Sequence, residues 1–146
     1  MDPLSGALEL LPHGPEFRFL DRLVALRPGE SGEAEYRVRD DELFLRGHFP
    51  GQPIFPGVLL VEAAAQLAGV VGQSDPKIGA LPDLKLTALR AVKILGAVQP
   101  GETIVLRAEV TGRLGHLIQA RASAWVGEAK VLEAELTLSG GAPLAR

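Results

Sequence analysis

The sequence predicts an α+β fold in which one long central helix is wrapped by a curved antiparallel β-sheet. Residues 57–72 form a helical pattern that is apolar on almost every side, and four later segments resemble strands separated by turn signals. The length of 146 residues suits one domain with a sizeable core. We therefore expect a single domain over residues 1–146, with a frayed tail from about residue 140.

The first third of the chain predicts a short helix or loop followed by two strands. Residues 4–11 favour the helix or loop, and residues 19–26 begin a strand pattern that an Arg-Pro-Gly-Glu turn at residues 27–30 ends. Residues 33–39 alternate between apolar and polar side chains, as a half-buried strand does. The irregular residues 40–56 lead into the helix.

The helix is expected at the centre of the fold because it has almost no polar face. Several of its side chains are small, which would let a sheet approach closely: Ala63, Ala64, Ala65, Ala68 and Gly69. After a loop at residues 73–80, strands are predicted at residues 84–95, 102–111, 117–126 and 130–138. Turn signals at residues 99–102, 112–115 and 126–128 favour a meander of these strands. One helix cannot cover so large a sheet, which favours a dimer.

The composition is that of a soluble globular protein. Hydrophobic residues make up 47% of the chain and charged residues 23%, and the absence of cysteine fits a cytoplasmic location. Residues 1–6 lack the features of a secretory signal. A net charge of -3, with one Trp and one Tyr, argues against nucleic-acid binding. The most apolar stretch, residues 54–72, contains Pro56, Glu62 and Gln66, so we expect a buried helix and no membrane span.

We expect no metal and no cofactor. The three histidines, His13, His48 and His116, have no metal-ligand spacing. Neither a serine-hydrolase elbow nor a phosphate-binding glycine loop is present. We expect His13 to have a structural role and His116 to lie in a hairpin turn. The remaining chemistry is acid-base chemistry.

The most informative segment is the run at residues 47–66, which reads GHFPGQPIFPGVLLVEAAAQ. Three prolines and three glycines restrict the path of its loop, because proline locks φ and glycine adopts conformations closed to other residues. Such a loop can hold His48 in one direction. The apolar helix that follows contains one carboxylate, Glu62, with the amide of Gln66 one turn later on the same face.

This segment closely resembles the FabZ-type 3-hydroxyacyl-(acyl-carrier-protein) dehydratases of fatty-acid synthesis, whose signature is GHFPGxPxxPGVLxxEAxAQ; every fixed position is present. Segments at residues 11–13, 20–22 and 98–102 also match, so the resemblance spans nearly the whole chain. It implies the hot-dog fold and dimers, often assembled as a trimer of dimers. Glu62, where a sister family that also isomerises has aspartate, points to the FabZ type. The chain departs from the family at residues 12–17 and 91–94, which bear on acyl length and carrier docking.

Dehydration of a 3-hydroxyacyl thioester needs a base for the C2 proton and an acid for the departing hydroxyl. Histidine exchanges protons near neutral pH, so His48 suits the base. The apolar neighbours of Glu62 favour its protonated form, which suits the acid. Free N–H groups at the helix start, on Gly57 and Val58, can stabilise the thioester oxygen. The resemblance implies this role for the Gly57 amide, with His48 and Glu62 contributed by opposite subunits; Gln66 would then orient Glu62.

The resemblance also implies a substrate carried on the phosphopantetheine arm of acyl carrier protein, an acidic partner. Residues 83–93 contain Lys85, Arg90 and Lys93 against Asp83, a local excess of +2 that favours such a partner. The same charges also suit a solvated strand edge. Two alternative functions are a hot-dog acyl thioesterase and a non-catalytic subunit that binds an acyl chain or its carrier. The altered segment at residues 13–17 also suits a secondary lipid or polyketide-like pathway.

Overall fold

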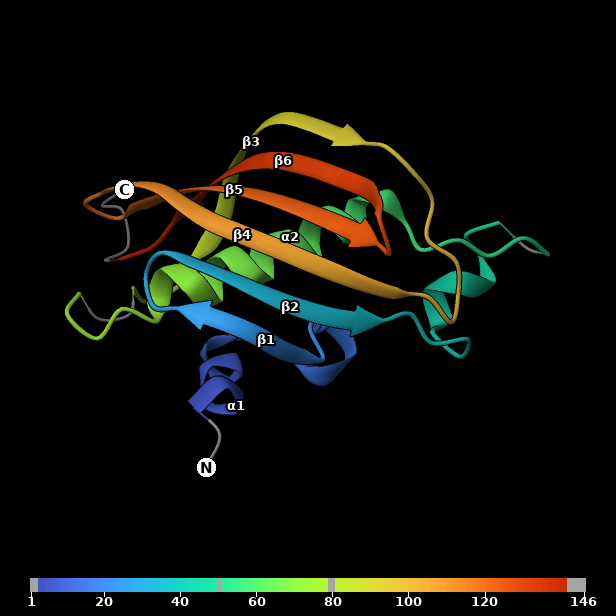
Figure 1. Ribbon diagram of the computed structural model, residues 1–146, viewed down its shortest axis with the longest axis horizontal. Helices are drawn as coiled ribbons and strands as arrows, with labels where there is room; N and C mark the ends of the chain where they lie inside the picture. The colour runs from blue at the N-terminus through green and yellow to red at the C-terminus, as the bar shows by residue number, and fades with distance from the viewer. Residues whose placement is uncertain (1–2, 50, 79–80, 142–146) are drawn as a thin grey trace, which may run out of the picture.

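The computed structural model describes residues 3–49, 51–78 and 81–141, and in them a curved antiparallel sheet wraps around one long helix (Figure 1). The helices are α1 (Pro3–Ala7) and α2 (Gly57–Gln73), with short 3-10 helices at Leu8–Leu10, Pro15–Phe17 and Leu43–Arg46. The strands are β1 (Arg22–Arg27), β2 (Ser31–Arg37), β3 (Lys85–Ile94), β4 (Thr103–Leu114), β5 (Leu117–Val126) and β6 (Ala129–Ser139). This arrangement confirms the predicted α+β class and the hot-dog fold.

The strand order is β1-β2-β4-β5-β6-β3, which corrects the predicted meander. Strands β4, β5 and β6 do form a meander, but β3 pairs with β6 at the far edge and not with β4. The connection over residues 95–102 is too long for a tight hairpin. It carries the chain from β3 across to β2, with which β4 pairs. Two backbone hydrogen bonds hold this connection in place: Val38 N donates to Glu102 O at 3.0 Å, and Phe55 N donates to Val98 O at 2.7 Å.

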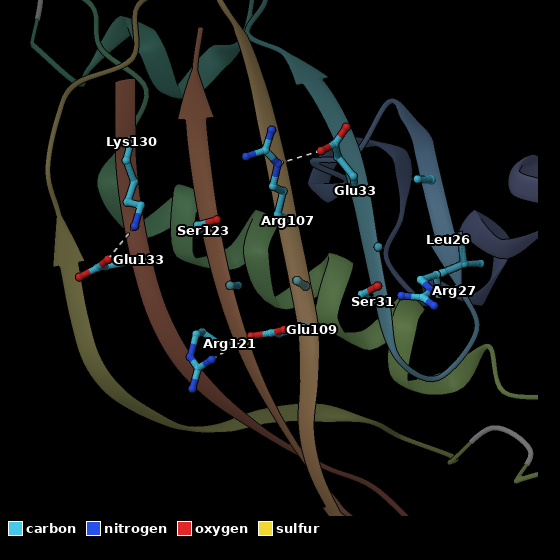
Figure 2. Close-up of a pocket in the computed structure, with 14 residues that line it drawn as sticks. Leu26, Arg27, Ser31, Glu33, Arg107, Glu109, Arg121, Ser123, Lys130 and Glu133 are labelled. Atoms are coloured by element: carbon cyan, nitrogen blue, oxygen red, sulfur yellow. Dashed lines mark hydrogen bonds and ion pairs between the residues drawn. The ribbon is translucent and has the colours of Figure 1, made fainter. Parts of the chain in front are cut away.

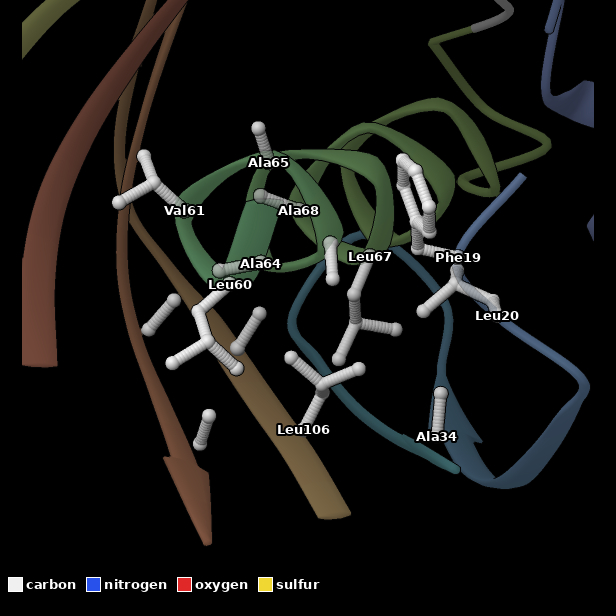
Figure 3. Close-up of a cluster of buried hydrophobic side chains, with 14 of the residues drawn as sticks. Phe19, Leu20, Ala34, Leu60, Val61, Ala64, Ala65, Leu67, Ala68 and Leu106 are labelled. Atoms are coloured by element: carbon white, nitrogen blue, oxygen red, sulfur yellow. The ribbon is translucent and has the colours of Figure 1, made fainter. Parts of the chain in front are cut away.

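Helix α2 is buried along most of its length, as its apolar pattern predicts. Leu60, Ala64, Leu67 and Ala68 are at most 1% exposed and pack with Leu106 of β4 (Figure 3). Burial of each large aliphatic side chain contributes about 1.5–3 kcal/mol. The helix is therefore fixed firmly against the concave face of the sheet.

Three glycines allow the closest approaches between α2 and the sheet, and none of them is among the small residues that the sequence indicated. A Cβ on Gly32 of β2 would lie 2.7 Å from Val71 Cγ2, and a Cβ on Gly72 would lie 2.8 Å from Ile118 Cδ1. Gly69 has only ordinary contacts, with Leu84 Cδ2 at 3.7 Å. The sheet therefore approaches closely near the end of the helix and also at its start, where a Cβ on Gly57 would lie 2.8 Å from Ile94 Cδ1 of β3.

The observed boundaries differ from the predicted ones at β1, β2 and β4. Strand β2 spans residues 31–37, where 33–39 was predicted. Strand β1 begins at Arg22, because the buried residue Phe19 donates its backbone N–H to a helix side chain and not to a strand. Strand β4 continues to Leu114, past a register shift between Val110 and Gly112. Gly140 and Gly141, where a frayed tail was expected, donate backbone hydrogen bonds to His116 O and Pro82 O. Pro50 of the signature, residues 79–80 of the predicted loop and residues 142–146 of the predicted tail lie outside the described residues.

Strand β3 is exposed on both of its faces. It pairs with β6 on one side, and its other edge has no partner strand within the described residues. Its apolar side chains Leu89, Val92 and Ile94 are 46%, 36% and 51% exposed. An unpaired strand edge with exposed apolar side chains is a template for pairing with another strand.

Candidate functional site

His48 lies in a loop that restricts both its backbone and its ring. The 3-10 helix Leu43–Arg46 leads into the loop, and Ile54 N donates to His48 O at 3.4 Å. Phe49, next to His48, has a φ of +67°, and a non-glycine residue in this region commonly marks a functional loop. The Phe49 ring lies 4.5 Å from the His48 ring, centroid to centroid. The sequence therefore places a half-buried imidazole in a constrained position.

The hydrogen bond of the His48 ring determines which nitrogen is free. Nδ1 lies 3.0 Å from Ile54 O. A carbonyl oxygen can only accept, so Nδ1 carries the proton in this bond. In the neutral ring Nε2 is then unprotonated, which is the form that a general base requires.

Glu62 and Gln66 form a hydrogen-bonded pair on one face of α2. Gln66 Nε2 donates to Glu62 Oε2 at 3.0 Å and to Phe17 O at 2.8 Å, while Gln66 Oε1 accepts the N–H of Phe19 at 2.8 Å. The amide orientation is fixed, because a backbone N–H needs the oxygen and a backbone carbonyl needs the NH₂ group. The predicted contact between Gln66 and Glu62 is thus present.

His13, for which the sequence predicted only a structural role, lies next to Glu62. Its Nε2 lies 3.3 Å from Glu62 Oε2, and its ring stacks on Phe17 at 6.0 Å between centroids. The sequence contained one signal for it, the Leu-Pro-His run at residues 11–13 that matches the dehydratase family. That signal lies 49 residues from Glu62 (62 minus 13), so only the folded chain brings the two together.

A cavity of about 520 Å³ lies beside these three side chains. Its wall combines α2, the segment before the first strand and the ends of β3 and β6. The lining consists of Leu10, Leu11, Pro12, His13, Glu62, Ala65, Gln66, Gly69, Gln73, Asp83, Leu84, Lys85, Leu86 and Leu138. Apolar side chains dominate, and the polar groups include those of Glu62, Gln66 and His13. Such a cavity suits an apolar chain with a polar end.

The apolar loop residues Ile54 and Phe55 lie away from this cavity. Phe55 is 1% exposed and packs in the aromatic core, 5.9 Å from the ring of Phe19. Ile54 lines a separate hollow with Phe49 and Pro100. Within one chain, the apolar wall beside Glu62 therefore comes from the N-terminal segment and from the sheet.

The first turn of α2 has free backbone donors. Pro56 precedes the helix, and its carbonyl accepts the N–H groups of Leu59 and Leu60 at 2.9 and 3.2 Å. No acceptor for Gly57 N or Val58 N is present among the described residues. Unpaired N–H groups at a helix start carry partial positive charge and suit a developing oxyanion. Gly57 also packs closely on β3, because a Cβ there would lie 2.8 Å from Ile94 Cδ1.

His48 and Glu62 do not meet within one chain. His48 contacts Ile54 and Phe49, Glu62 contacts Gln66 and His13, and no hydrogen bond or ion pair joins the two among the contacts of the described chain. The predicted acid and base are thus both present and separately positioned.

A hollow of about 430 Å³ on the outer face of the sheet contains none of the predicted site residues (Figure 2). Most of its charged side chains already form pairs: Arg107 with Glu33 at 2.8 Å and Arg121 with Glu109 at 2.8 Å across neighbouring strands, and Lys130 with Glu133 at 3.0 Å along β6. Exposed pairs of this kind each contribute less than about 1 kcal/mol. We interpret this surface as a solvated sheet face.

A larger cavity, of about 790 Å³, lies between the N-terminal segment and the residues after β2. In it Tyr36 Oη donates to Glu42 Oε1, and Glu42 Oε2 is buried without a partner in the described structure. Burial raises the pKa of Glu42 to about 7; a backbone hydrogen bond from Arg39 opposes this rise, and the charge of Asp21 adds to it. A carboxyl with this pKa changes its charge near neutral pH.

The basic residues on β3 are partly neutralised by the neighbouring strand. Arg90 lies 3.8 Å from Glu135, and Lys93 lies 3.5 Å from Glu133. Lys85 lines the cavity beside Glu62. Among the described residues no group of three or more His, Cys, Asp or Glu side chains is arranged to hold a metal ion. None of the helices in that part of the chain is long and apolar enough to cross a membrane.

Most of the chain matches a known protein family. Residues 11–135 match the model of the FabA-like domain. The chain is 33% identical over 137 residues to a protein of Caldicellulosiruptor saccharolyticus named 3-hydroxyacyl-[acyl-carrier-protein] dehydratase FabZ, covering 93% of this chain and 96% of that protein. It is 37% identical over 135 residues to a protein of the same name from Myxococcus xanthus, covering 90% and 87%.

Solved structures share the fold at low sequence identity. The dehydratase heterocomplex ApeI:P from Xenorhabdus doucetiae superposes with a TM-score of 0.77 at 16% identity, covering 93% of this chain and 91% of that one. The virulence protein Cj0977 from Campylobacter jejuni has a TM-score of 0.71 at 9% identity, covering 96% and 91%. These similarities show a common architecture.

Proposed function

Since this chain belongs to the FabA-like domain family, we propose that it removes water from 3-hydroxyacyl-(acyl-carrier-protein) to form the trans-2-enoyl thioester in fatty-acid synthesis. The observation that carries this proposal is the position of Glu62. Its carboxyl lies in the wall of an apolar cavity and is held there by Gln66. A partly buried acid beside an apolar cavity suits elimination of a hydroxyl from an acyl chain.

In the proposed reaction His48 and Glu62 move one proton each. His48 Nε2 takes the proton from C2 of the acyl chain. Glu62 gives its proton to the C3 hydroxyl, the C3–O bond breaks, and water leaves as the C2–C3 double bond forms. The N–H groups of Gly57 and Val58 stabilise the negative charge on the thioester oxygen, a contribution of about 3–4 kcal/mol per donor in other enzymes. No cofactor takes part in this scheme.

We propose that a second copy of the chain completes the site. Within one chain His48 and Glu62 have separate partners, and β3 presents a free apolar edge. Phe49 and Val58 are also exposed, by 56% and 73%. Pairing of β3 with the partner's β3 would cover these surfaces and bring the His48 of one protomer to the Glu62 of the other. Assembly of three such dimers stays a prediction.

Acyl carrier protein is the proposed carrier of the substrate. The names of the relatives specify this carrier for those proteins. Lys85 at the cavity of this chain is an exposed cation suited to the acidic carrier or its phosphopantetheine arm, whereas Arg90 and Lys93 already have carboxylate neighbours. We therefore expect carrier docking to depend on Lys85 more than on the other two.

The deciding experiment measures hydration of crotonyl and longer 2-enoyl thioesters by the loss of their absorbance, because an enzyme catalyses both directions of its reaction. We expect turnover by the wild type and a loss of at least about 100-fold in His48→Ala and Glu62→Gln. His116→Gln, at an exposed hairpin position, is the matched control with wild-type rates expected. Circular dichroism and gel filtration would verify folding of each variant.

Two outcomes would contradict the dehydratase proposal. Stable binding of acylated carriers without turnover at any chain length would favour the non-catalytic binding subunit. Release of free thiol from the thioester would indicate a thioesterase.

A further inference from the structure

The contact between His13 and Glu62 joins two titratable side chains in the wall of the same cavity. His13 Nε2 lies 3.3 Å from Glu62 Oε2, and the two side chains are 28% and 24% exposed. The ring of His13 is held by stacking on Phe17, with 29° between the planes. Both partners are therefore partly withdrawn from water, where a hydrogen bond is stronger than on the surface.

Glu62 Oε2 also accepts a hydrogen bond from the amide nitrogen of Gln66. Gln66 Nε2 donates to Oε2 at 3.0 Å, and the backbone groups of Phe17 and Phe19 fix the orientation of the Gln66 amide. Glu62 Oε1 has no hydrogen-bond partner among the described residues. The two oxygens of the carboxyl group are thus in different environments.

The other nitrogen of His13 indicates its tautomer. His13 Nδ1 is buried and has no hydrogen-bond partner in the described part of the chain. Buried N–H groups without a partner are rarer in proteins than buried acceptors that lack one. The ring therefore carries its proton on Nε2, the nitrogen that faces Glu62 Oε2 at 3.3 Å.

We propose that His13 is a positioning residue for Glu62: with Gln66 it occupies Oε2, keeps the transferable proton on Oε1, and stabilises the carboxylate left after that proton is given away. This inference rests on the proposed dehydratase function. It assigns His13 a role in the rate of turnover, whereas a purely structural histidine would affect folding alone. The proton that leaves Glu62 still goes to the departing hydroxyl, as described above.

The test compares two substitutions at His13, each of which keeps one property of the side chain. His13→Gln keeps an N–H donor near the position of Nε2, and His13→Phe keeps the ring and its stacking but has no donor. We expect His13→Phe to lower kcat by about 10- to 100-fold, the loss of one hydrogen bond to a charged group, with KM changed less than about twofold. His13→Gln should stay within about threefold of the wild-type kcat. If His13→Phe does not fold, His13→Leu serves as the variant without a donor.

A double-mutant cycle separates this role from general damage. In the Glu62→Gln background, adding His13→Phe should leave the residual rate unchanged, because the group on which His13 acts is already lost. Wild-type kcat in folded His13→Phe, equal losses in the Gln and Phe variants, or an additive effect in the cycle would each overturn the proposal. An inactive wild type would instead contradict the proposed function itself.

Discussion

Gln66 Oε1 accepts the backbone N–H of Phe19 at 2.8 Å, across 47 residues of sequence. The same amide donates to Phe17 O and to Glu62, although its residue is only 2% exposed. One side chain thus ties helix α2 to the segment that precedes β1 and also holds the acid of the proposed site. Stability and catalysis are coupled at this position.

Substitution of Gln66 by Leu should therefore lower both stability and activity. It leaves the buried N–H of Phe19 without its partner and removes the hydrogen bond to Phe17 O, at a cost of about 1–3 kcal/mol. Urea unfolding measures the loss, and Gln119→Leu on the exposed face of β5 is the control, with a change below about 0.5 kcal/mol. A Gln66→Leu protein as stable as the wild type would contradict this account.

Two glycines of the same helix should respond to alanine with opposite signs. Gly69→Ala meets only ordinary contacts and should stabilise the protein by about 0.5–1 kcal/mol through helix propensity. Gly72→Ala places its Cβ 2.8 Å from Ile118 Cδ1, and overpacking should destabilise by about 1–2 kcal/mol. Thermal unfolding distinguishes the two. Adding Ile118→Val to Gly72→Ala removes the clashing methyl group and should recover part of the loss.

Glu42 should make stability depend on pH in the weakly acid range. Burial raises its pKa from 4.5 to about 7, so between these values the folded protein holds a proton that the unfolded chain releases. The stabilising contribution is complete below pH 4.5 and is lost as the pH rises to about 7. Glu42→Gln, which mimics the protonated acid, should be as stable as the wild type near pH 5 and more stable at pH 8. Urea titrations that stay parallel for the two proteins over this range would refute the prediction.

Mixing two inactive variants should restore activity if each site combines two protomers. In a mixed dimer of His48→Ala and Glu62→Gln, one site has lost both groups and the other keeps both. Random exchange at equal amounts makes half of the dimers mixed, so about one quarter of the wild-type activity is expected. The measurement is the enoyl-thioester hydration rate after refolding the variants together, compared with each refolded alone. No recovery would place His48 and Glu62 of an active site in one chain.

A charge on the free edge of β3 should separate the protomers. Leu89→Glu puts a carboxylate on the exposed apolar edge, which opposes strand pairing between copies. We expect a monomer by gel filtration or light scattering and a rate reduced at least about 100-fold, with secondary structure retained. Leu114→Glu, at a residue that is 79% exposed at the end of β4, is the control that should leave assembly and activity intact. A dimeric Leu89→Glu protein would argue for a different interface.

The local sequence pattern was sufficient to predict the secondary-structure elements and the family. The apolar run from Gly57 predicted α2 to within one residue of its end at Gln73, because helix formation depends on neighbours three and four positions apart. Alternation and turn signals located the strands within a few residues. The signature from Gly47 to Gln66 predicted the dehydratase family, which the family match and the FabZ relatives confirm.

The sequence pattern did not determine the contacts between distant segments of the chain. The pairing of β3 with β6, the close packing at Gly72, the contact of His13 with Glu62 and the separation of Glu62 from His48 all depend on the complete fold. Local propensity cannot encode them, because a strand has two edges and a histidine beside a turn has many possible neighbours. Only the packing of the helix against the complete sheet selects one edge and one neighbour, and thereby determines how the acid of the proposed site is held.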